Sequence, residues 1–360
     1  MRCLFIVHNA VSYYYIKRYM DVIERHFPDA RIGLCVDRND QFVDAMAQLA
    51  SIPIPPLTLD EALTQPWDIA FFAAHGGAHR LPDTTCKIHI QHGLGYGKRV
   101  LGDNYTYGPV WTMRDERCIY DLFFEASHTE ALRVEQAFPH LAGRLCVIGS
   151  LTADDLLATR PSPQAYGITC ESRVVLLMST WGPTSLWQYL CTAPDSIDLF
   201  HGFTERDVIL ISLHPHLITH PATSHYLERL AARGLRVHWT YDEDEAHRFM
   251  QLAQVGLSDN TSLALYYCLL RKPLYTVASH WHSVGVTYDP SVLQTALSRV
   301  PALDRLEQAF VPENQQLAQQ AIGALAPDIL SYPRQAEQRL VHTIAALAET
   351  ITQGSGYGRY

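Results

Sequence analysis

Short apolar runs alternate with longer amphipathic segments from the first residues of the chain. Four apolar runs of strand length occur in the first hundred residues, at 3–9, 30–37, 67–77 and 86–93. Apolar residues recur at helical spacing in 13–27 and 41–50, between the first runs. Continuous apolar strands separated by helical patterns are typical of parallel sheets that are covered on both faces. The pattern therefore predicts βαβ units of a doubly wound sheet.

The alternation continues through the chain but is interrupted once. Strands at 122–127 and 145–150, with a helix at 128–138 between them, close the first series. Residues 158–172 are rich in proline and small polar residues, which predicts a linker. A second series follows, with predicted strands at 173–181, 207–216, 234–240, 253–260 and 273–279.

The pattern therefore predicts an α/β protein with two Rossmann-like doubly wound domains that face each other across a cleft. This architecture suggests a nucleotide-sugar transferase type of enzyme, although the fold alone does not give a function. The expected segments are an N-terminal Rossmann-like acceptor domain at 1–157, a linker at 158–172, a C-terminal Rossmann-like nucleotide-donor domain at 173–330, a C-terminal helix at 331–351 and a flexible tail at 352–360.

Composition narrows the class of protein. The 360-residue chain carries a net charge of -9, with a pI near 6.0, which argues against general nucleic-acid binding. No apolar run approaches the roughly 18 residues that span a bilayer, and the N-terminus lacks a signal-peptide pattern. The eight scattered cysteines include no C-x-x-C pair, so we expect a reduced, cytoplasmic protein with at most peripheral membrane contact.

The segment 255–275 is the strongest local signal for a binding site. An apolar strand delivers Asp259 to its carboxyl end, and Asn260 or Thr261 can cap the following helix. Thr261 and Ser262 place hydroxyls beside the unpaired N–H groups of the helix N-terminus, which favours phosphate binding. A routine helix cap without a ligand is the alternative.

Two further strand ends carry candidate residues. His214 ends an apolar strand in LISLHPHL and could bond a phosphate oxygen, serve as a structural histidine, or join His216 and His220 in a metal site. The metal reading is weak because the set has no carboxylate or cysteine at matching spacing, so we expect no metal. The strand at 173–181 ends in Ser179, Thr180 and Trp181, whose indole could stack on a nucleobase or fill the core.

Three histidines fall at predicted strand ends in the first half, namely His8, His75 and His92. His92 lies in KIHIQHGLGYGKR, where a strand runs into a glycine-rich loop that includes Gly93 and ends with Lys98 and Arg99. Ligands collect at the carboxyl ends of parallel strands, so these residues are candidates for a second side of the site. The chain has no G-x-G-x-x-G or Walker loop, which argues against an NAD enzyme or a P-loop nucleotidase.

Taken in order, these segments resemble the CDP-glycerol glycerophosphotransferase family of teichoic-acid and capsule polymerases, which have the GT-B fold. The segments that carry the resemblance, over 86 to about 280, are QHGLGYGK, EASHTEALRVEQAF, VIGSLTADDLL, MSTWG, LHPHL and LSDNTSLALYYCLLRKPLY. The family has His-Gly-Thr-Pro, Ser-Pro-Ser, Gly-x-Pro-Arg-x-Asp, Thr-Trp-Arg, Leu-His-Pro-Arg and Thr-Asp-Tyr-Ser-Ser at these places.

The resemblance implies a role for each matching residue. His92 would be the general base toward an acceptor hydroxyl, whereas His214, Thr261 and Ser262 would hold the pyrophosphate of the donor. An alcohol would attack the phosphorus of an activated phospho-alcohol and expel CMP, mostly through positioning and electrostatics. No metal or other cofactor is required if the histidine and the helix terminus neutralise the charge.

The chain departs from the family pattern on the donor side. Gly182 and His216 stand where the family has arginines, Asn260 and Thr261 replace Tyr-Ser, and Tyr266 replaces an acidic residue. The loss of two cations and a carboxylate predicts a donor site of different charge. Lys98 or Arg99 could supply the missing cations from the other half of the chain.

The leading hypothesis is a transferase that moves a glycerol-phosphate-like group from a CDP-activated donor to a glycan or lipid-linked acceptor, at the cytoplasmic side of surface polysaccharide assembly. A GT-B glycosyltransferase that uses a CMP- or UDP-sugar is the first alternative. A nucleotide-sugar 2-epimerase and a non-catalytic domain that binds carbohydrate or a lipid carrier are the others. Oligomeric state and the identity of the acceptor do not follow from the sequence.

Overall fold

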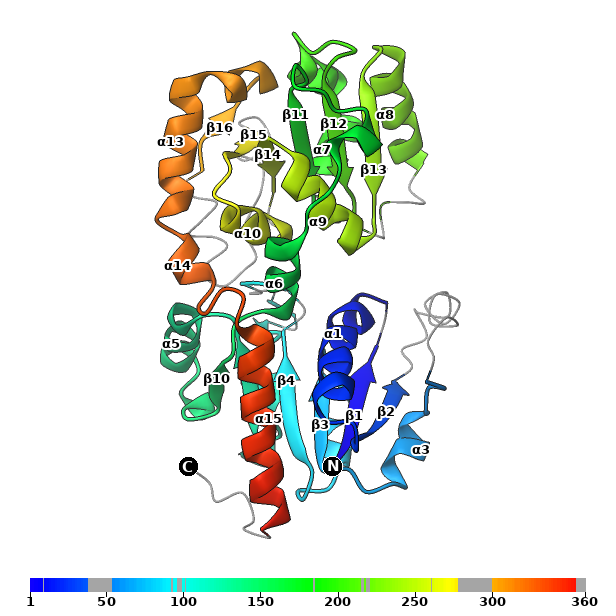
Figure 1. Cartoon of the computed structure of the whole chain (residues 1–360), viewed down its shortest axis with the longest axis vertical. Coiled ribbons are helices and arrows are strands. Elements are labelled where there is room, and N and C mark those ends of the chain that lie inside the picture. Colours follow the sequence, from blue (N-terminus) through cyan, green and yellow to red (C-terminus); the bar gives the residue numbers. More distant parts are fainter. Residues whose placement is uncertain are drawn as a thin grey trace. The chain divides into compact units, whose positions relative to one another are not determined.

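The chain forms two compact units, each built around one parallel sheet. The computed structural model describes residues 1–8, 10–37, 54–91, 93–95, 99–100, 102–183, 185–214, 217, 221–259, 261–277 and 300–353. Unit 1 consists of 1–154 and 330–360, and unit 2 of 155–329. Figure 1 shows the elements of unit 1 in blue, cyan and red, and those of unit 2 mainly in green, yellow and orange.

The sheet of unit 1 has six parallel strands in the order β10-β9-β4-β3-β1-β2. The strands are β1 (Arg2–Val7), β2 (Arg31–Val36), β3 (Ile69–Phe72), β4 (Cys86–Ile90), β9 (Leu122–Glu125) and β10 (Leu145–Val147). Every residue from Cys3 to Val7 is buried, because helices or loops cover both faces of the strand. That burial explains why β1 reads as a continuous apolar run in the sequence.

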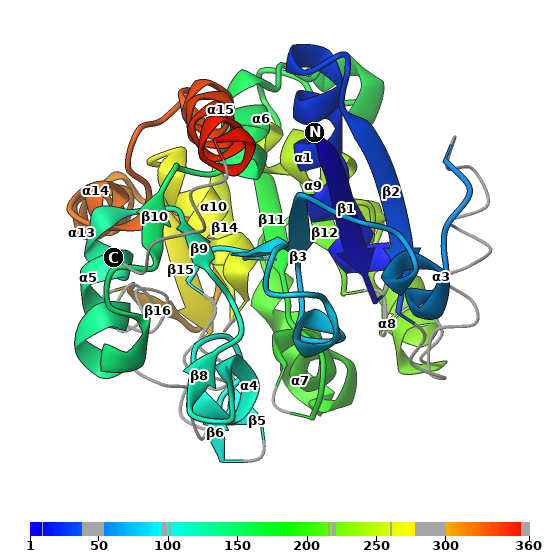
Figure 2. The ribbon, with the colours of Figure 1, turned by 90° about the horizontal axis from the view of Figure 1, so that it is seen from below.

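Helices α1 (Ala10–His26), α6 (Leu151–Ala158) and α15 (Ala336–Thr352) pack against one face of this sheet. In α1, Ile16, Met20 and Ile23 recur at three- and four-residue spacing and join the core with Phe5 and Phe71 of the strands. The shorter helix α3 (Leu59–Leu63) and α5 (His128–Ala137) contribute to the core on the other face. Figure 2 shows α1 and α15 on one side of the sheet.

An irregular segment connects β4 to β9 in unit 1. Its described residues form two small antiparallel pairs and one helical turn: β5 (Arg99–Val100), β6 (Asp103–Asn104), α4 (Pro109–Thr112), β7 (Met113–Arg114) and β8 (Arg117–Cys118). Tyr107 and Tyr120 from this segment are buried in the same core as Phe123. The segment lies on the face of the sheet opposite α1 and α15 (Figure 2).

The sheet of unit 2 also has six parallel strands, in the order β13-β12-β11-β14-β15-β16. The strands are β11 (Val174–Met178), β12 (Val208–Ser212), β13 (Arg236–Thr240), β14 (Val255–Ser258), β15 (Leu274–Val277) and β16 (Ala302–Leu303). The α/β class and the pair of Rossmann-like doubly wound sheets predicted from the sequence are therefore confirmed.

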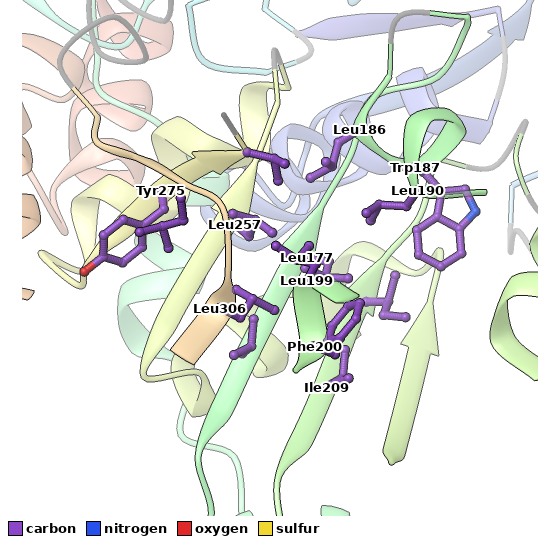
Figure 3. Packing of buried hydrophobic residues seen from close by; sticks show 14 of the residues in the cluster. Leu177, Leu186, Trp187, Leu190, Leu199, Phe200, Ile209, Leu257, Tyr275 and Leu306 are labelled. Carbon is purple, nitrogen blue, oxygen red and sulfur yellow. The ribbon is translucent and has the colours of Figure 1, made fainter. Parts of the chain in front are cut away.

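Helices cover the sheet of unit 2. The helices that the structure describes in this unit are η4 (Pro163–Tyr166), α7 (Leu186–Thr192), η5 (Pro194–Phe200), α8 (Pro221–Ala232), α9 (Glu243–Leu252), α10 (Ser262–Leu269), η7 (Leu306–Phe310), α13 (Pro312–Gly323) and α14 (Ala326–Ile329). Figure 3 shows one packed face, where Trp187 and Leu190 of α7 and Phe200 of η5 meet Leu177 and Ile209 of the strands. Elements α9 and α10 pack against the strands as well.

The contacts of α6 and α15 set the limits of the two units. The division at 154/155 falls inside α6, and 163–166 within the expected linker form η4. Helix α15, which the sequence analysis set apart from both domains, packs against α1 in unit 1. The carboxylate of Asp154 accepts hydrogen bonds from the backbone N–H groups of Arg334 (2.5 Å) and Ala336 (2.9 Å), which fixes the start of α15.

Among the residues that the structure describes, no helix combines the length and the apolar composition that crossing a membrane requires.

Candidate functional site

The strand order of unit 2 changes direction between β11 and β14. From β11 the chain proceeds to β12 and β13 on one side, and then returns to add β14 on the other side. In open parallel sheets, ligands bind at the carboxyl ends of the two strands that flank such a reversal. Ser179 and Thr180 follow β11, and Asp259 follows β14, so these three predicted residues lie at the reversal.

Asp259 fastens the loop after β11 to the end of β14. Its carboxylate is 1% exposed and accepts hydrogen bonds from the Ser179 hydroxyl (2.7 Å) and from the backbone N–H groups of Thr180 (2.8 Å) and Leu186 (2.7 Å). The Ser179 hydroxyl also accepts a hydrogen bond from the backbone N–H of Trp187 at 2.9 Å. These three hydrogen-bond donors compensate the carboxylate for the water that it loses on burial. Asp259 and Ser179 therefore hold the loop after β11, and their role in phosphate binding stays a prediction.

Trp181 and His214, which follow the neighbouring strands β11 and β12, lie side by side. Their ring centroids are 5.8 Å apart and the ring planes are tilted by 37°. Trp181 is 48% exposed, so the indole does not fill the core. The next residue, Gly182, has a φ of +103°, a conformation that favours glycine. The arginine of the family pattern at this position would thus be strained here, and the stacking role of Trp181 stays a prediction.

The N-terminus of α10 lies on the other side of Asp259. Thr261 is the N-cap, its backbone N–H donates to the Asp259 carbonyl oxygen (2.9 Å), and its hydroxyl accepts from the Leu263 N–H at 3.4 Å. Thr261 and Ser262 are both half-buried, whereas the following turns of the helix are buried. Tyr266 is 2% exposed, so the acidic residue that the family has there would be buried in this chain. The phosphate role of Thr261 and Ser262 stays a prediction.

The strand order in the sheet of unit 1 changes direction between β1 and β3. His8 follows β1, Asp37 follows β2, and the turn with His75 and Gly76 follows β3. The carboxyl ends of these adjacent strands thus place the predicted residues His8 and His75 on one edge of the sheet, where the sequence analysis expected an acceptor.

His75 belongs to an aromatic cluster rather than to an open strand end. Its Nδ1 lies 2.9 Å from the Tyr120 hydroxyl, and its ring stacks on His89 with centroids 4.8 Å apart. Tyr105 contacts the same ring edge-on at 5.3 Å. Gly93 is buried with a φ of +137°, so glycine is needed there. His92, Lys98, His216 and Asn260 lie outside the described residues.

A buried polar network next to β4 was missed by the sequence analysis. Glu125, the last residue of β9, is fully buried and accepts hydrogen bonds from the Tyr107 hydroxyl (3.0 Å) and from the Gln91 side-chain amide. The Gln91 amide also bonds to the Tyr107 hydroxyl. Burial raises the pKa of Glu125 well above its usual range. The sequence signal for this network is the glutamate inside the apolar run LFFEAS, since a buried carboxylate needs hydrogen-bond donors.

Among the described residues, no group of three or more His, Cys, Asp or Glu side chains is placed to hold a metal ion.

The comparisons with known proteins agree with the fold. No protein-family model and no curated protein sequence matches the chain. Two solved structures of the wall teichoic acid polymerase TagF superpose with TM-scores of 0.67 and 0.66 at 14% and 16% identity, covering 98% of this chain and 89% and 90% of theirs. One of them was soaked with CDPG.

A second group of similar structures comprises UDP-GlcNAc 2-epimerases. The enzyme from Neisseria meningitidis, bound to UDP-GlcNAc, superposes with a TM-score of 0.56 at 12% identity, covering 96% of this chain and all of the epimerase chain. At these identities the likeness shows the fold. The chain has a GT-B-like fold, as the sequence analysis expected.

Proposed function

We propose that the chain is a transferase of the CDP-glycerol glycerophosphotransferase type. The observation that carries the proposal is the reversal point of unit 2, where Asp259 fixes the loop that carries Thr180 and Trp181. The loop and the start of α10 border the same strand end, as a bound nucleotide diphosphate would require. The likeness to TagF and the order of the sequence motifs support the CDP-activated donor.

In this proposal unit 2 binds the donor. The Trp181 indole stacks on the nucleobase, while His214 and the free N–H groups beside Thr261 and Ser262 bind the diphosphate. A histidine and a helix N-terminus neutralise part of the diphosphate charge, so no metal or other cofactor is required.

Unit 1 binds the acceptor and supplies the base. An acceptor hydroxyl oxygen attacks the phosphorus that bears the glycerol group, the bond between that phosphorus and the CMP oxygen breaks, and CMP leaves. His92 takes the hydroxyl proton as general base. The acceptor is a glycan or a lipid-linked glycan of the cell surface, and the reaction takes place in the cytoplasm at the inner face of the membrane.

The products of the reaction test the proposal. The chain is incubated with CDP-glycerol and with membranes that carry lipid-linked glycans, and the phosphorus is followed by ³¹P NMR. We expect CMP together with a phosphodiester on the acceptor. No CMP release would contradict the proposal. The variant His92→Ala should lose turnover and keep CMP affinity, whereas Ser262→Ala should weaken CMP binding.

A nucleotide-sugar enzyme is the second candidate, favoured by the likeness to the UDP-GlcNAc 2-epimerases. Incubation with UDP-GlcNAc separates the two classes. Epimerisation without an acceptor would identify an epimerase, and a phosphorus-free glycoside together with a free nucleotide would identify a glycosyltransferase.

A further inference from the structure

His8 and Asp37 form a pair at the reversal point of unit 1. They follow the neighbouring strands β1 and β2, and the Asp37 N–H donates to the Val7 carbonyl oxygen at 3.0 Å, so the pairing of the strands extends to this residue. The His8 N–H donates to the Ser12 hydroxyl at 3.0 Å, and Ser12 is itself 3% exposed. Both backbones are thus fixed, and the two side chains are held on the same edge.

The side chains face each other. His8 Nδ1 lies 3.6 Å from Asp37 Oδ2, and the side chains are 12% and 26% exposed. This separation is an ion-pair distance and is longer than a hydrogen bond. A carboxylate on that side favours the tautomer with the proton on Nδ1, which leaves Nε2 as the acceptor nitrogen.

Gly76, in the turn after β3, packs directly against this pair. A Cβ atom at position 76 would lie 2.4 Å from His8 Cε1, 2.9 Å from His8 Nε2 and 2.5 Å from Asp37 Oδ2. The φ of Gly76 is not in the left-handed region, so the close approach accounts for the glycine and the backbone conformation does not. Any side chain at this position would push the pair apart.

His8 Nε2 is buried and has no hydrogen-bond partner among the described residues. A buried polar atom without a partner costs about 1–3 kcal/mol. A histidine kept only for packing would be replaced by an apolar ring without that cost. A metal is disfavoured because no suitable group of ligands occurs in the described part of the chain. Nε2 is therefore open to a hydrogen-bond donor beyond the described residues.

We propose that His8 and Asp37 are a hydroxyl-binding dyad for a polyhydroxylated acceptor. A hydroxyl of the acceptor substrate donates a hydrogen bond to Nε2 of His8. Asp37 keeps the proton of the imidazole on Nδ1, so that Nε2 can accept this bond. Gly76 lies against Nε2, so an incoming hydroxyl displaces this turn slightly, which the absence of a side chain permits. The dyad positions the acceptor, and His92 keeps the role of base. This inference rests on the proposed function, in which unit 1 binds the acceptor.

Kinetics with both substrates test the role in acceptor binding. We expect His8→Ala and Asp37→Ala to raise the acceptor KM about tenfold or more, with a smaller change in kcat and with unchanged CMP affinity. Gly76→Ala should do the same although it alters neither member of the pair. Gly323→Ala is the matched control, since nothing lies within 4 Å of its added Cβ. An unchanged acceptor KM in the first three variants would overturn the proposal.

The tautomer of His8 tests the dyad without any substrate. In ¹⁵N-histidine NMR spectra of the whole chain above the titration range, we expect His8 to be protonated on Nδ1 and unprotonated on Nε2. Asp37→Ala and Gly76→Ala should remove this preference, while circular dichroism shows that they fold. A proton on Nε2 in the wild-type chain would reject the dyad even if the transferase reaction is found. The expected tautomer without any transfer would leave the dyad standing and reject the proposed function.

Discussion

Trp181 combines two properties that a core residue does not have. Its indole is half exposed, and its ring centroid lies 5.8 Å from that of His214, beyond the carboxyl ends of β11 and β12. Flat aromatic faces that keep contact with solvent are suited to stack on a base, since stacking needs an accessible ring face. The sequence left two roles open for Trp181, filling the core and stacking on a nucleobase. The exposure of the indole argues against the first role and is compatible with the second.

We predict that Trp181→Ala weakens CMP binding about 10-fold or more and changes the free energy of unfolding by less than about 0.5 kcal/mol. The variant loses the stacking contact between the indole and the nucleobase, but it loses little packing because the side chain is half exposed. Isothermal titration calorimetry and urea unfolding measure the two effects. Trp239→Ala is the matched control, because Trp239 is 44% exposed on the edge strand β13. Equal CMP affinity in the wild type and in Trp181→Ala would refute the stacking role.

Glu125 predicts a pH effect whose sign follows from its burial. The buried site raises the pKa of Glu125 above the value of 4.5 that is typical of an exposed glutamate. From about pH 4.5 upward, the unfolded chain releases this proton while the folded chain retains it. The contribution of Glu125 to stability is therefore complete below pH 4.5 and is lost as the pH rises toward the pKa of the folded state.

We predict that the difference in unfolding free energy between the wild type and Glu125→Gln falls as the pH rises above 4.5, by up to about 1.4 kcal/mol per pH unit. Urea unfolding at a series of pH values from 4.5 to 8 measures this difference. Glu135→Gln, at an exposed position on α5, serves as the control for replacing a glutamate by glutamine. A difference that rises with pH would show that Glu125 is ionised in the folded state.

The loop after β11 owes its position to groups far apart in the sequence. Asp259 bonds to residues that lie 80, 79 and 73 positions away along the chain. Such a network connects the ends of two neighbouring strands, so the element that carries Trp181 depends on β14 for its conformation. Removing one partner of a buried carboxylate network leaves donors unpaired.

We predict that Asp259→Ala destabilises the chain by about 3–5 kcal/mol, since each unpaired buried donor costs about 1–3 kcal/mol, and that it lowers CMP affinity as well. Three donors lose their acceptor, and the loop that carries Trp181 is released. Asp198→Ala, at an exposed position in η5, should change neither quantity. Urea unfolding and calorimetry provide the two readouts. Full stability in Asp259→Ala would contradict the network, and full stability loss with intact CMP affinity would separate the loop from the nucleotide site.

The side chain of Lys272 caps the C-terminal end of helix α9, although Lys272 is not part of that helix. Its Nζ donates to the carbonyl oxygens of Met250 (3.1 Å), Gln251 (2.5 Å) and Ala253 (2.8 Å), at the C-terminal end of the helix, where a cation is favoured. We predict that Lys272→Met lowers the free energy of unfolding by about 2–3 kcal/mol. Arg271→Met is the control, since that neighbouring side chain is exposed. An equal loss in both variants would rule out the cap.

At the level of the whole chain, the strands that are buried on both faces were predictable. The apolar runs at 3–9 and 173–181 became β1 and β11, since nearly every residue of these two strands is buried. The strand ends then placed His8 and His214 correctly on sheet edges. The irregular segment between β4 and β9 was not predicted, because its two-residue strands carry no periodic pattern.

The roles of side chains at the strand ends could not be read from the sequence. The loop-holding role of Asp259 depends on three hydrogen-bond donors that only the fold brings together. The same holds for Asp37, whose partner His8 is remote in the chain, and for Gln91 and Glu125. The sequence motifs thus indicate at which strand ends a site lies. The hydrogen-bond partners of each side chain there determine its role.

The binding of nucleotides tests most directly that unit 2 takes a nucleotide-activated donor. Thermal unfolding of the whole chain is followed with CMP, CDP-glycerol, UDP and UDP-GlcNAc, in the wild type and in Trp181→Ala. We predict that CMP and CDP-glycerol raise the unfolding temperature of the wild type in a dose-dependent manner, that UDP does not, and that the shift is reduced in Trp181→Ala. A shift with UDP and UDP-GlcNAc alone would favour the nucleotide-sugar enzyme. The absence of a shift with all four nucleotides would contradict a nucleotide-activated donor.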